Sequence, residues 1–439
     1  MSTVSTTTNS AMDRVTMQVQ DFFGDDADIT RLFANCFSNT MHTTILPKGD
    51  KDTFVITGDI PAMWLRDSTA QVRPYLLLAK ENQEISNLLE GVIYRQLRSI
   101  LLDPYANAFN ETDNGQGHQT DRTDMLPGIW ERKYEIDSLC YPIQLAYLYW
   151  KATGVISHLQ SDEFQSAVQA ILALWRTEQN HEKDSPYVFE RLGERELDTL
   201  SRGGKGPLAE VTGMTWCGFR PSDDACTYSY LIPANMFAVV VLRYLEEIYQ
   251  DVLGDAVTAQ SVAALAAEID AGIRQYGIVE HEEFGKIFAY EVDGFGHHVL
   301  MDDANIPSLL ALPYLGYCDK ADPIYLNTRK FILSAGNPFY FSGKVRGIGS
   351  SHTPDAYIWS MAVSMQGLTS TDAAERKELL AMLCKMDAGT GMMHEGIDVN
   401  NLTQFTREWF SWSNMLFCEF VLSEMGQWVA ASPLAEQHA

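Results

Sequence analysis

The chain has 439 residues, of which 46% are hydrophobic, so it is long and apolar enough to bury a large core. Lys and Arg number 32 and Asp and Glu number 58, and the resulting formal net charge of −26 disfavours nucleic acid and anionic membranes as partners. Length alone would allow two or three domains, but no linker-like or low-complexity segment divides the sequence, so we expect one domain over residues 1–439.

The N-terminal segment, residues 1–12, is rich in Ser and Thr, and we expect it to be flexible. It lacks the basic and apolar regions of a secretory signal, and no apolar run in the chain approaches the roughly 20 residues that span a membrane. The cysteines are odd in number, scattered and without a CxxC pair, which is typical of reduced, buried thiols. They are Cys36, Cys140, Cys217, Cys226, Cys318, Cys384 and Cys418. These features predict a cytoplasmic protein with no membrane partner.

From residue 64 onward, a short polar phrase carrying an acid or a tryptophan precedes an apolar stretch six times. The phrases are residues 64–68, 134–138, 221–224, 301–305, 352–355 and 409–414. Stretches that follow them, such as 139–150, 232–245 and 415–422, are hydrophobic on nearly all sides, which predicts buried helices. A single phrase is explained by helix capping, because Asp and Ser are favoured at the N-cap. Capping does not explain the Arg, His and Trp residues that accompany these acids.

Between the phrases, the sequence predicts helices with one wet face. Apolar residues at i, i+3, i+4, i+7 spacing cover 85–101 and 164–175, and Ser161 is a good N-cap for the second of these helices. Buried and half-exposed helices therefore alternate. We interpret this alternation as an all-α (α/α)6 toroid with six inner and six outer helices. Because the inner helices of such a ring are parallel, the six phrases would gather at one end, around one cavity.

Two acidic elements are candidates for chemistry: the pair Asp223 and Asp224, and Glu395 in a Gly-rich loop. Acids that converge on a tryptophan-rich cavity suit glycosidic bond cleavage, which needs a proton donor and a carboxylate. Adjacent carboxylates repel, so one aspartate could cap a helix while the other keeps its proton. Arg66 beside Asp67 either clamps vicinal hydroxyls of a terminal sugar or forms a local salt bridge at the barrel mouth.

Two other pairs of adjacent residues, one acidic and one of histidines, are interpreted as structural and not as ligand-binding. For Asp302 and Asp303, capping is favoured over contact with a ligand. His297 and His298 are adjacent, and adjacent side chains on an extended segment point in opposite directions. We therefore predict no metal site there, and no metal or other cofactor elsewhere.

Three stretches, residues 58–71, 218–225 and 231–236, resemble glycoside hydrolase family 125, the exo-acting α-1,6-mannosidases. The similarity extends from about residue 22 to about residue 428. The resemblance implies an (α/α)6 barrel, removal of a terminal α-1,6-linked mannose with inversion at the anomeric carbon, and no catalytic metal. It also implies that an aspartate of the phrase at 221–224 is the general acid and that Glu395 is the general base. The phrase at 64–68 shows a weaker resemblance to the sugar clamp of glucoamylase-like toroids.

We assign the general acid to Asp223, because Asp224 stands where an N-cap for a helix beginning near Ala225 would fall. Protonated Asp223 would donate to the glycosidic oxygen while ionised Glu395 takes a proton from water on the opposite face of the sugar. This requires the two carboxyl groups to stand about 6.5–9.5 Å apart. It also requires a raised pKa for Asp223, which burial and the adjacent Asp224 would favour.

The predicted substrate-binding residues complete the site. Trp64, Arg66 and Asp67 are candidates for the closed wall that exo action needs, with Asp224 beside them. Further lining candidates are His352, Asp355, Trp409 and Trp412. The expected partner is an α-mannoside oligosaccharide or an N-glycan fragment, while the oligomeric state stays open. The alternatives are a calcium-dependent α-mannosidase, a phosphorylase, and a carbohydrate-binding toroid without catalysis.

Overall fold

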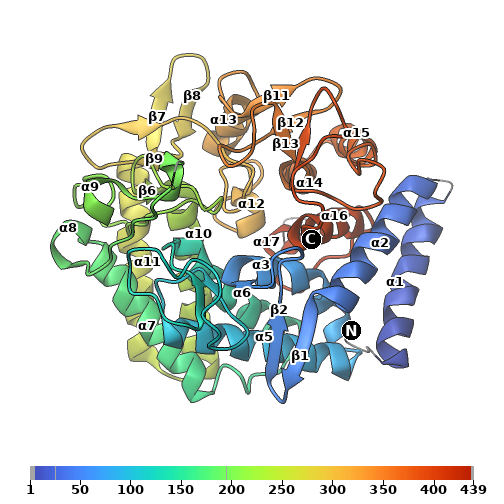
Figure 1. The fold of residues 1–439 in the computed structure, drawn as a ribbon, viewed down its shortest axis with the longest axis horizontal. Helices are drawn as coiled ribbons and strands as arrows, with labels where there is room; N and C mark the ends of the chain where they lie inside the picture. Colours follow the sequence, from blue (N-terminus) through green and yellow to red (C-terminus); the bar gives the residue numbers. More distant parts are fainter. Residues whose placement is uncertain (1–4, 25, 194, 437–439) are drawn as a thin grey trace.

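The computed structural model describes residues 5–24, 26–193 and 195–436. Within them, six helices form a closed ring, because each contacts the next and the last contacts the first. In ring order they are α3 (Leu65–Val72), α6 (Ile136–Thr153), α10 (Ile232–Glu247), α12 (Leu312–Leu315), α14 (Ser360–Thr369) and α16 (Ser411–Glu424). Figure 1 shows these helices around the centre of the molecule, with the other helices outside them. The predicted (α/α)6 toroid is confirmed.

The inner helices are buried as their sequences predict. Every described residue of α14 and nearly every residue of α16 is buried, and α6 and α10 expose side chains only near their C-terminal ends. The exception in length is α12, which has four residues. Pro307 and Pro313 restrict the backbone before and within it, and Gly316 ends it in a left-handed conformation at φ 95°.

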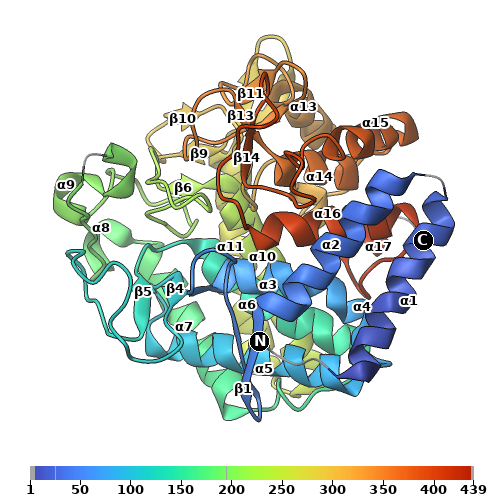
Figure 2. The same cartoon turned by 45° about the vertical axis from the view of Figure 1, so that its right-hand side comes forward.

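The outer helices bury part of their residues and leave the rest exposed. They are α2 (Ala27–Thr43), α5 (Gln83–Leu102), α7 (Asp162–Glu178), α11 (Ala256–Tyr276), α13 (Pro323–Ile332) and α15 (Ala373–Leu383). Ser161 caps α7 as predicted, since its Oγ accepts a hydrogen bond from the Phe164 N–H at 3.1 Å. Outside α2 lies α1 (Thr6–Phe23), and Figures 1 and 2 both show this pair side by side.

The flexibility predicted for residues 1–12 stays a prediction; residues 1–4 lie outside the described residues, and the structure places the others at the start of a helix. Thr6 begins α1, and Ser5 caps it by accepting from the Thr8 N–H at 3.4 Å. Ala11 and Met12 belong to a buried apolar stripe on α1. The Ser and Thr residues therefore form a helix start, and the apolar stripe behind them anchors the segment against α2.

Short strands precede several inner helices and hold their N-terminal ends. The strands β3 (Met63–Trp64), β6 (Tyr230–Leu231) and β13 (Tyr357–Trp359) run directly into α3, α10 and α14. Their antiparallel partners are β4 (Ala108–Phe109), β9 (Glu291–Val292) and β14 (Gly396–Asp398), and β5 (Ile129–Glu131) and β10 (His298–Val299) extend two of these small sheets. Figure 2 shows β4, β5, β6, β9, β10, β13 and β14 beside the ring. Backbone pairing thus fixes the polar phrases in register at one rim of the toroid.

The remaining elements connect the ring. Three hairpins consist of β1 (Ile45–Gly49) with β2 (Asp52–Val55), β7 (Ile278–His281) with β8 (Gly285–Phe288), and β11 (Tyr340–Ser342) with β12 (Arg346–Ile348). Short helical turns are η1 (Arg73–Tyr75), α4 (Leu76–Ala79), α8 (His181–Asp184), η2 (Glu196–Asp198), α9 (Ser201–Gly204), η3 (Ile248–Val252) and α17 (Pro433–Glu436). Among the described residues, no helix combines the length and the apolar composition needed to cross a membrane.

Candidate active site

A cavity of about 240 Å³ opens at the rim where the inner helices begin. Trp64 ends β3, Arg66 and Asp67 start α3, and Trp412 starts α16, so the N-terminal ends of these helices form part of its wall. This volume is below the about 300–1,000 Å³ of pockets for drug-sized ligands, and it leaves room for about one sugar ring. Helix N-termini favour nearby carboxylates, which suits a site built from acids.

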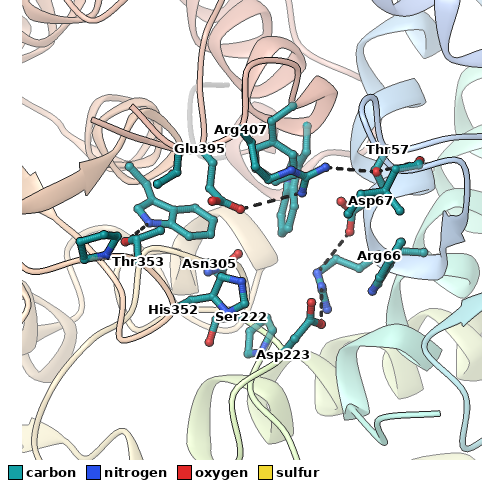
Figure 3. A pocket seen from close by; sticks show the side chains of 18 residues that line it. Thr57, Arg66, Asp67, Ser222, Asp223, Asn305, His352, Thr353, Glu395 and Arg407 are labelled. Atoms are coloured by element: carbon teal, nitrogen blue, oxygen red, sulfur yellow. Dashed lines mark hydrogen bonds and ion pairs between the residues drawn. The ribbon is translucent and has the colours of Figure 1, made fainter. Parts of the chain in front are cut away.

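The structure brings seven of the ten predicted site residues to this cavity. They are Trp64, Arg66, Asp67, Asp223, His352, Glu395 and Trp412. Figure 3 shows Glu395 entering from one side together with Arg407, while Asp223 enters from the opposite side beside Arg66. Residues more than 300 positions apart in the sequence therefore meet at one rim, as the toroid requires.

Three predicted lining residues do not line the cavity. Asp355 is exposed, and Trp409 donates its Nε1–H to Asn39 Oδ1 at 2.9 Å. Side chains alternate along an extended segment, so Phe410, the next residue, faces the cavity instead of Trp409. Asp224 is fully buried behind the wall.

Several lining residues were not predicted from the sequence. They are Thr57, Ile60, Pro221, Ser222, Asn305, Thr353, Pro354, Trp359, Thr406, Arg407 and Phe410. Trp359 could have been found, because it directly precedes the apolar residues of α14 as Trp64 precedes α3. Arg407 had no such signal, since it lies in a loop whose path is set by distant contacts.

A tight turn at residues 219–225 separates the two neighbouring aspartates. Phe219 and Ala225 form an antiparallel bridge, and Asp223 adopts a left-handed conformation at φ 66°, which Asp tolerates better than most residues. The Asp223 side chain faces the cavity and is 24% exposed. No helix begins near Ala225, because α10 begins at Ile232, so the prediction that Asp224 is an N-cap is wrong.

Asp224 instead joins a buried network behind the wall. Its carboxylate accepts a hydrogen bond from Ser351 Oγ at 2.6 Å and contacts His352 Nδ1 at 3.0 Å and Arg195 Nη2 at 2.7 Å. Burial lowers the pKa of His352, but the hydrogen bond and the charge of Asp224 outweigh it and raise that pKa above its ordinary value. Asp224 therefore favours the cationic form of the His352 ring, which lines the cavity together with Asp223 and Glu395.

Arg66 is the centre of a buried cluster of acids. Its guanidinium lies 3.5 Å from Asp67 Oδ2, 2.6 Å from Glu135 Oε2, 3.3 Å from Asp137 Oδ2 and 3.5 Å from Asp223 Oδ1. Burial raises the pKa of Asp67 and of Asp137 to about 6 in spite of the Arg66 charge. Arg66 and Asp67 thus form the local salt bridge that the sequence suggested. Both residues also line the cavity, which a clamp for sugar hydroxyls requires.

The predicted rise in the pKa of Asp223 is wrong for the free protein. Burial does raise it, but the charges of Arg66 and Lys133 outweigh burial and lower the pKa below its ordinary value. Lys133 also donates to the backbone oxygen of Asp223 at 2.7 Å. Asp224 does not supply the expected repulsion, because its carboxylate is engaged behind the wall by cationic partners.

Glu395 lies at the opposite side, just before β14, with a side chain that is 7% exposed. Burial raises its pKa, while Arg407, whose Nη1 is 3.8 Å from Oε1, and His352 oppose that rise. Arg407 is held by Asp59, with Nε 3.0 Å from Oδ1, and by Thr57. Between these two partners, Gly58 adopts φ 129°, and a Cβ there would lie 2.3 Å from the Trp409 oxygen, so only glycine fits.

The raised pKa of Asp67 predicts a pH-dependent stability. Because the folded protein disfavours the ionised carboxyl, this contribution to the free energy of unfolding is fully present below the unfolded pKa near 3.8 and is lost as pH rises through about 6. Asp67→Asn should not show this loss. Its free energy of unfolding should therefore fall between pH 4 and pH 7 by on the order of 2 kcal/mol less than that of the wild type. Urea unfolding at several pH values measures this, with the exposed Asp21→Asn on α1 as the control. Parallel curves for Asp67→Asn and the wild type would contradict the expectation.

The described residues contain no group of three or more His, Cys, Asp or Glu side chains arranged to hold a metal ion. None of the seven cysteines forms a disulfide, and five of them are buried as predicted, while Cys318 and Cys384 are partly exposed. Cys217 and Cys226 face each other at the base of the Asp223 turn, with their Sγ atoms 3.9 Å apart.

Comparison with known proteins agrees with this arrangement. A structure of a metal-independent α-mannosidase from Streptococcus pneumoniae, in a non-productive complex with α-1,6-mannobiose, is 50% identical and superposes with a TM-score of 0.91 over 94% of this chain and 98% of that one. The meiotically up-regulated gene 157 protein of Schizosaccharomyces pombe is 42% identical over 91% of this chain and 82% of its own length. A bacterial glucoamylase bound to acarbose shares the fold at 12% identity and a TM-score of 0.55, over 86% of this chain and 51% of that one.

The sequence pattern of one family spans nearly the whole chain. The model of the metal-independent α-mannosidases (GH125) matches residues 26–422. This match sets aside the calcium-dependent α-mannosidase and the toroid without catalysis as alternatives. The chain therefore belongs to glycoside hydrolase family 125, the metal-independent α-mannosidases.

Proposed function

We propose that the protein releases terminal α-1,6-linked mannose from α-mannoside oligosaccharides or N-glycan fragments by exo action, with inversion in a single displacement. The observation that carries this proposal is a cavity of about one sugar ring with Asp223 and Glu395 on opposite sides. The 50% identical protein from Streptococcus pneumoniae binds α-1,6-mannobiose, which supports the linkage. Single displacement needs a proton donor at the leaving oxygen and a base on the opposite face.

In this mechanism Asp223 is the general acid, because it reaches the cavity and Asp224 does not. Glu395 is the general base and takes a proton from the water that attacks the anomeric carbon. Arg407 lies beside Glu395 and favours its ionised form, which is the form that a base requires. The glycosidic bond breaks as Asp223 gives its proton to the departing oxygen.

The remaining wall would hold the sugar. Trp64, Trp359 and Trp412 offer apolar faces for stacking, and Arg66 and Asp67 offer a donor and an acceptor to neighbouring hydroxyls. The Arg66 Nε and Asp67 Oδ2 atoms face each other at 3.5 Å as an ion pair, which orients the two side chains in the wall.

The anomer released from α-1,6-mannobiose tests the proposal. Proton NMR of the reaction at early times should show β-mannose before mutarotation, with no change when phosphate or a chelator is added. α-1,2- and α-1,3-mannobiose are the matched controls and should react far more slowly. Initial release of α-mannose would overturn inversion, release of mannose 1-phosphate would identify a phosphorylase, and preference for another linkage would overturn the specificity.

The pH profile tests the role of Arg407. In Arg407→Gln the favourable charge beside Glu395 is lost, so the pKa of Glu395 should rise further. A base must be ionised, and the acidic limb of the kcat/KM profile should therefore move to higher pH by about 1 unit. Arg407→Lys keeps the charge and should move the limb less. An unmoved limb in Arg407→Gln would show that Arg407 does not act on the base.

We also propose a reducing compartment, the cytoplasm, as the site of action. The support is that none of the seven cysteines forms a disulfide, since secreted proteins of this cysteine content commonly form them. Fractionation of cells that express the chain, followed by immunoblotting, tests this assignment.

A further inference from the structure

Glu135 is a buried acid next to the cavity that the mechanism above does not use. It is the N-cap residue of α6, and its side chain is 0% exposed. Its Oε2 accepts hydrogen bonds from Arg66 Nη1 at 2.6 Å and from Ser138 Oγ at 2.8 Å. Glu135 does not line the cavity, so any influence on the substrate must pass through another residue.

That residue is Asp223, because shared donors bring the two carboxyl groups together. The Asn107 amide nitrogen is 3.4 Å from Glu135 Oε1 and 3.4 Å from Asp223 Oδ1. Arg66 spans the same pair, with Nη1 on Glu135 and Nη2 on Asp223. The charge of Asp223 is also one of the causes that raise the pKa of Glu135. Two neighbouring carboxylates repel, so the ionised form of one favours a proton on the other.

The charges around the pair explain why a proton stays there. Arg66 contacts Asp67, Glu135, Asp137 and Asp223, so its single positive charge is shared among four carboxyl groups. Lys133 Nζ donates to the Asp223 backbone oxygen at 2.7 Å and also lies 3.7 Å from Glu131 and 3.2 Å from Asp198, so its charge is shared as well. This surplus of carboxyl groups favours a proton within the cluster.

In the free protein the surroundings favour a proton on Glu135 over one on Asp223. Burial raises the pKa of Glu135 well above its ordinary value, and the charges of Asp223 and Asp137 add to that rise in spite of Arg66. Asp223 has a lowered pKa, because Arg66 and Lys133 outweigh its burial. A general acid with a low pKa is mostly ionised near neutral pH, so it needs a neighbouring group that supplies the proton.

We propose that Glu135 and Asp223 hold one proton between them and that this pair supplies the proton delivered to the glycosidic oxygen. The inference rests on the proposed role of Asp223 as the general acid. Glu135 acts through Asp223 and is a positioning residue for the proton. Glu135 allows Asp223 to act as an acid, because Glu135 is an adjacent proton donor. It can release its proton when the leaving oxygen develops negative charge.

The step balances as follows. The proton passes from Glu135 to Asp223, and Asp223 gives it to the glycosidic oxygen while the bond from that oxygen to the anomeric carbon breaks. Water forms the new bond to the anomeric carbon and gives a proton to Glu395. Glu135 is then a carboxylate beside Arg66, which stabilises it. After the products leave, Glu395 loses its proton to solvent and the pair takes one up.

The test compares wild type, Glu135→Gln, Glu135→Asp and Asp223→Asn on two substrates. α-1,6-Mannobiose needs protonation of its leaving group, whereas 2,4-dinitrophenyl α-mannoside does not. In Glu135→Gln, the basic limb of the kcat/KM profile on mannobiose should move at least about 1 unit to lower pH, so activity above the limb falls about tenfold or more. The aryl mannoside should react at nearly the wild-type rate.

Glu135→Asp keeps a carboxyl group and should place the limb between those of the wild type and Glu135→Gln; it also decides the question if Glu135→Gln does not fold. One outcome is that Asp223→Asn loses activity only on mannobiose, while the basic limb of the pH profile stays in place in both Glu135 variants. That outcome would overturn the shared proton but not the role of Asp223 as the general acid. Equal losses on both substrates, with the limb unmoved, would reduce Glu135 to a structural role. Absence of a leaving-group effect in Asp223→Asn would overturn the general acid itself, and this inference with it.

Discussion

Replacing Glu395 with alanine is expected to lower kcat on α-1,6-mannobiose by about 10²–10⁴-fold, the range for loss of a general base. The loss should be similar on 2,4-dinitrophenyl α-mannoside, because attack by water is required whatever the leaving group. The side chain lies in the cavity beside Arg407, so its removal leaves space next to the anomeric carbon. Steady-state rates on both substrates measure this expectation.

Added azide separates a lost base from a damaged site. A small anion that fits the space of the missing carboxylate should restore the reaction of the aryl mannoside and yield β-mannosyl azide by attack on the face opposite the leaving group. The matched control is Glu408→Ala, which removes an exposed acid from the loop that carries Arg407 and should leave the rate unchanged. Formation of α-mannosyl azide, or a near-wild-type rate without azide, would contradict the assignment of Glu395.

Asp223→Asn should have an effect of similar size on mannobiose, about 10²–10⁴-fold in kcat, but little effect on the aryl mannoside. The asparagine keeps the size of the side chain and its place on the left-handed turn, so binding of mannobiose should survive. Isothermal titration measures the binding, and the ratio of rates on the two substrates measures the dependence on acid catalysis.

Asp224→Asn is the matched control, since it changes the neighbouring aspartate that does not reach the cavity. It should weaken the contacts to His352 and Arg195 and affect both substrates alike. If Asp223→Asn hydrolyses mannobiose at nearly the wild-type rate while Asp224→Asn shows the leaving-group effect, the two aspartates exchange roles.

The helical ring could be predicted from the sequence because its signal is local and periodic. Stretches such as 139–150 and 415–422 are apolar on all sides, and only an inner position buries a helix in that way. The rim strands gave no comparable signal, since most have two or three residues and depend on partners elsewhere in the chain. The fourth inner helix is the shortest of the ring, because Pro307 and Pro313 interrupt the segment that follows Asp302 and Asp303.

The candidate site was predictable where a residue stands next to an inner helix, as Trp64, Arg66 and Asp67 do. Direction was harder to predict than position, because a single turn reverses neighbouring side chains. That is why Asp223 faces the cavity while Asp224 faces away, and why Phe410 replaces Trp409. Charge states were the least predictable, since the pKa of Asp223 depends on Arg66 and Lys133, which approach it from other segments.

Closure of the ring has a consequence for how activity arises as the chain is made. The Arg66 guanidinium lies 5.6 Å from the centre of the Trp412 ring, so the first and last inner helices share one stretch of wall. A growing polypeptide that stops before α16 lacks this stretch, and the groups from α3 face water. Such an intermediate cannot hydrolyse mannosides prematurely, because the enzyme acquires its catalytic pocket only when its final inner helix docks against its earliest one.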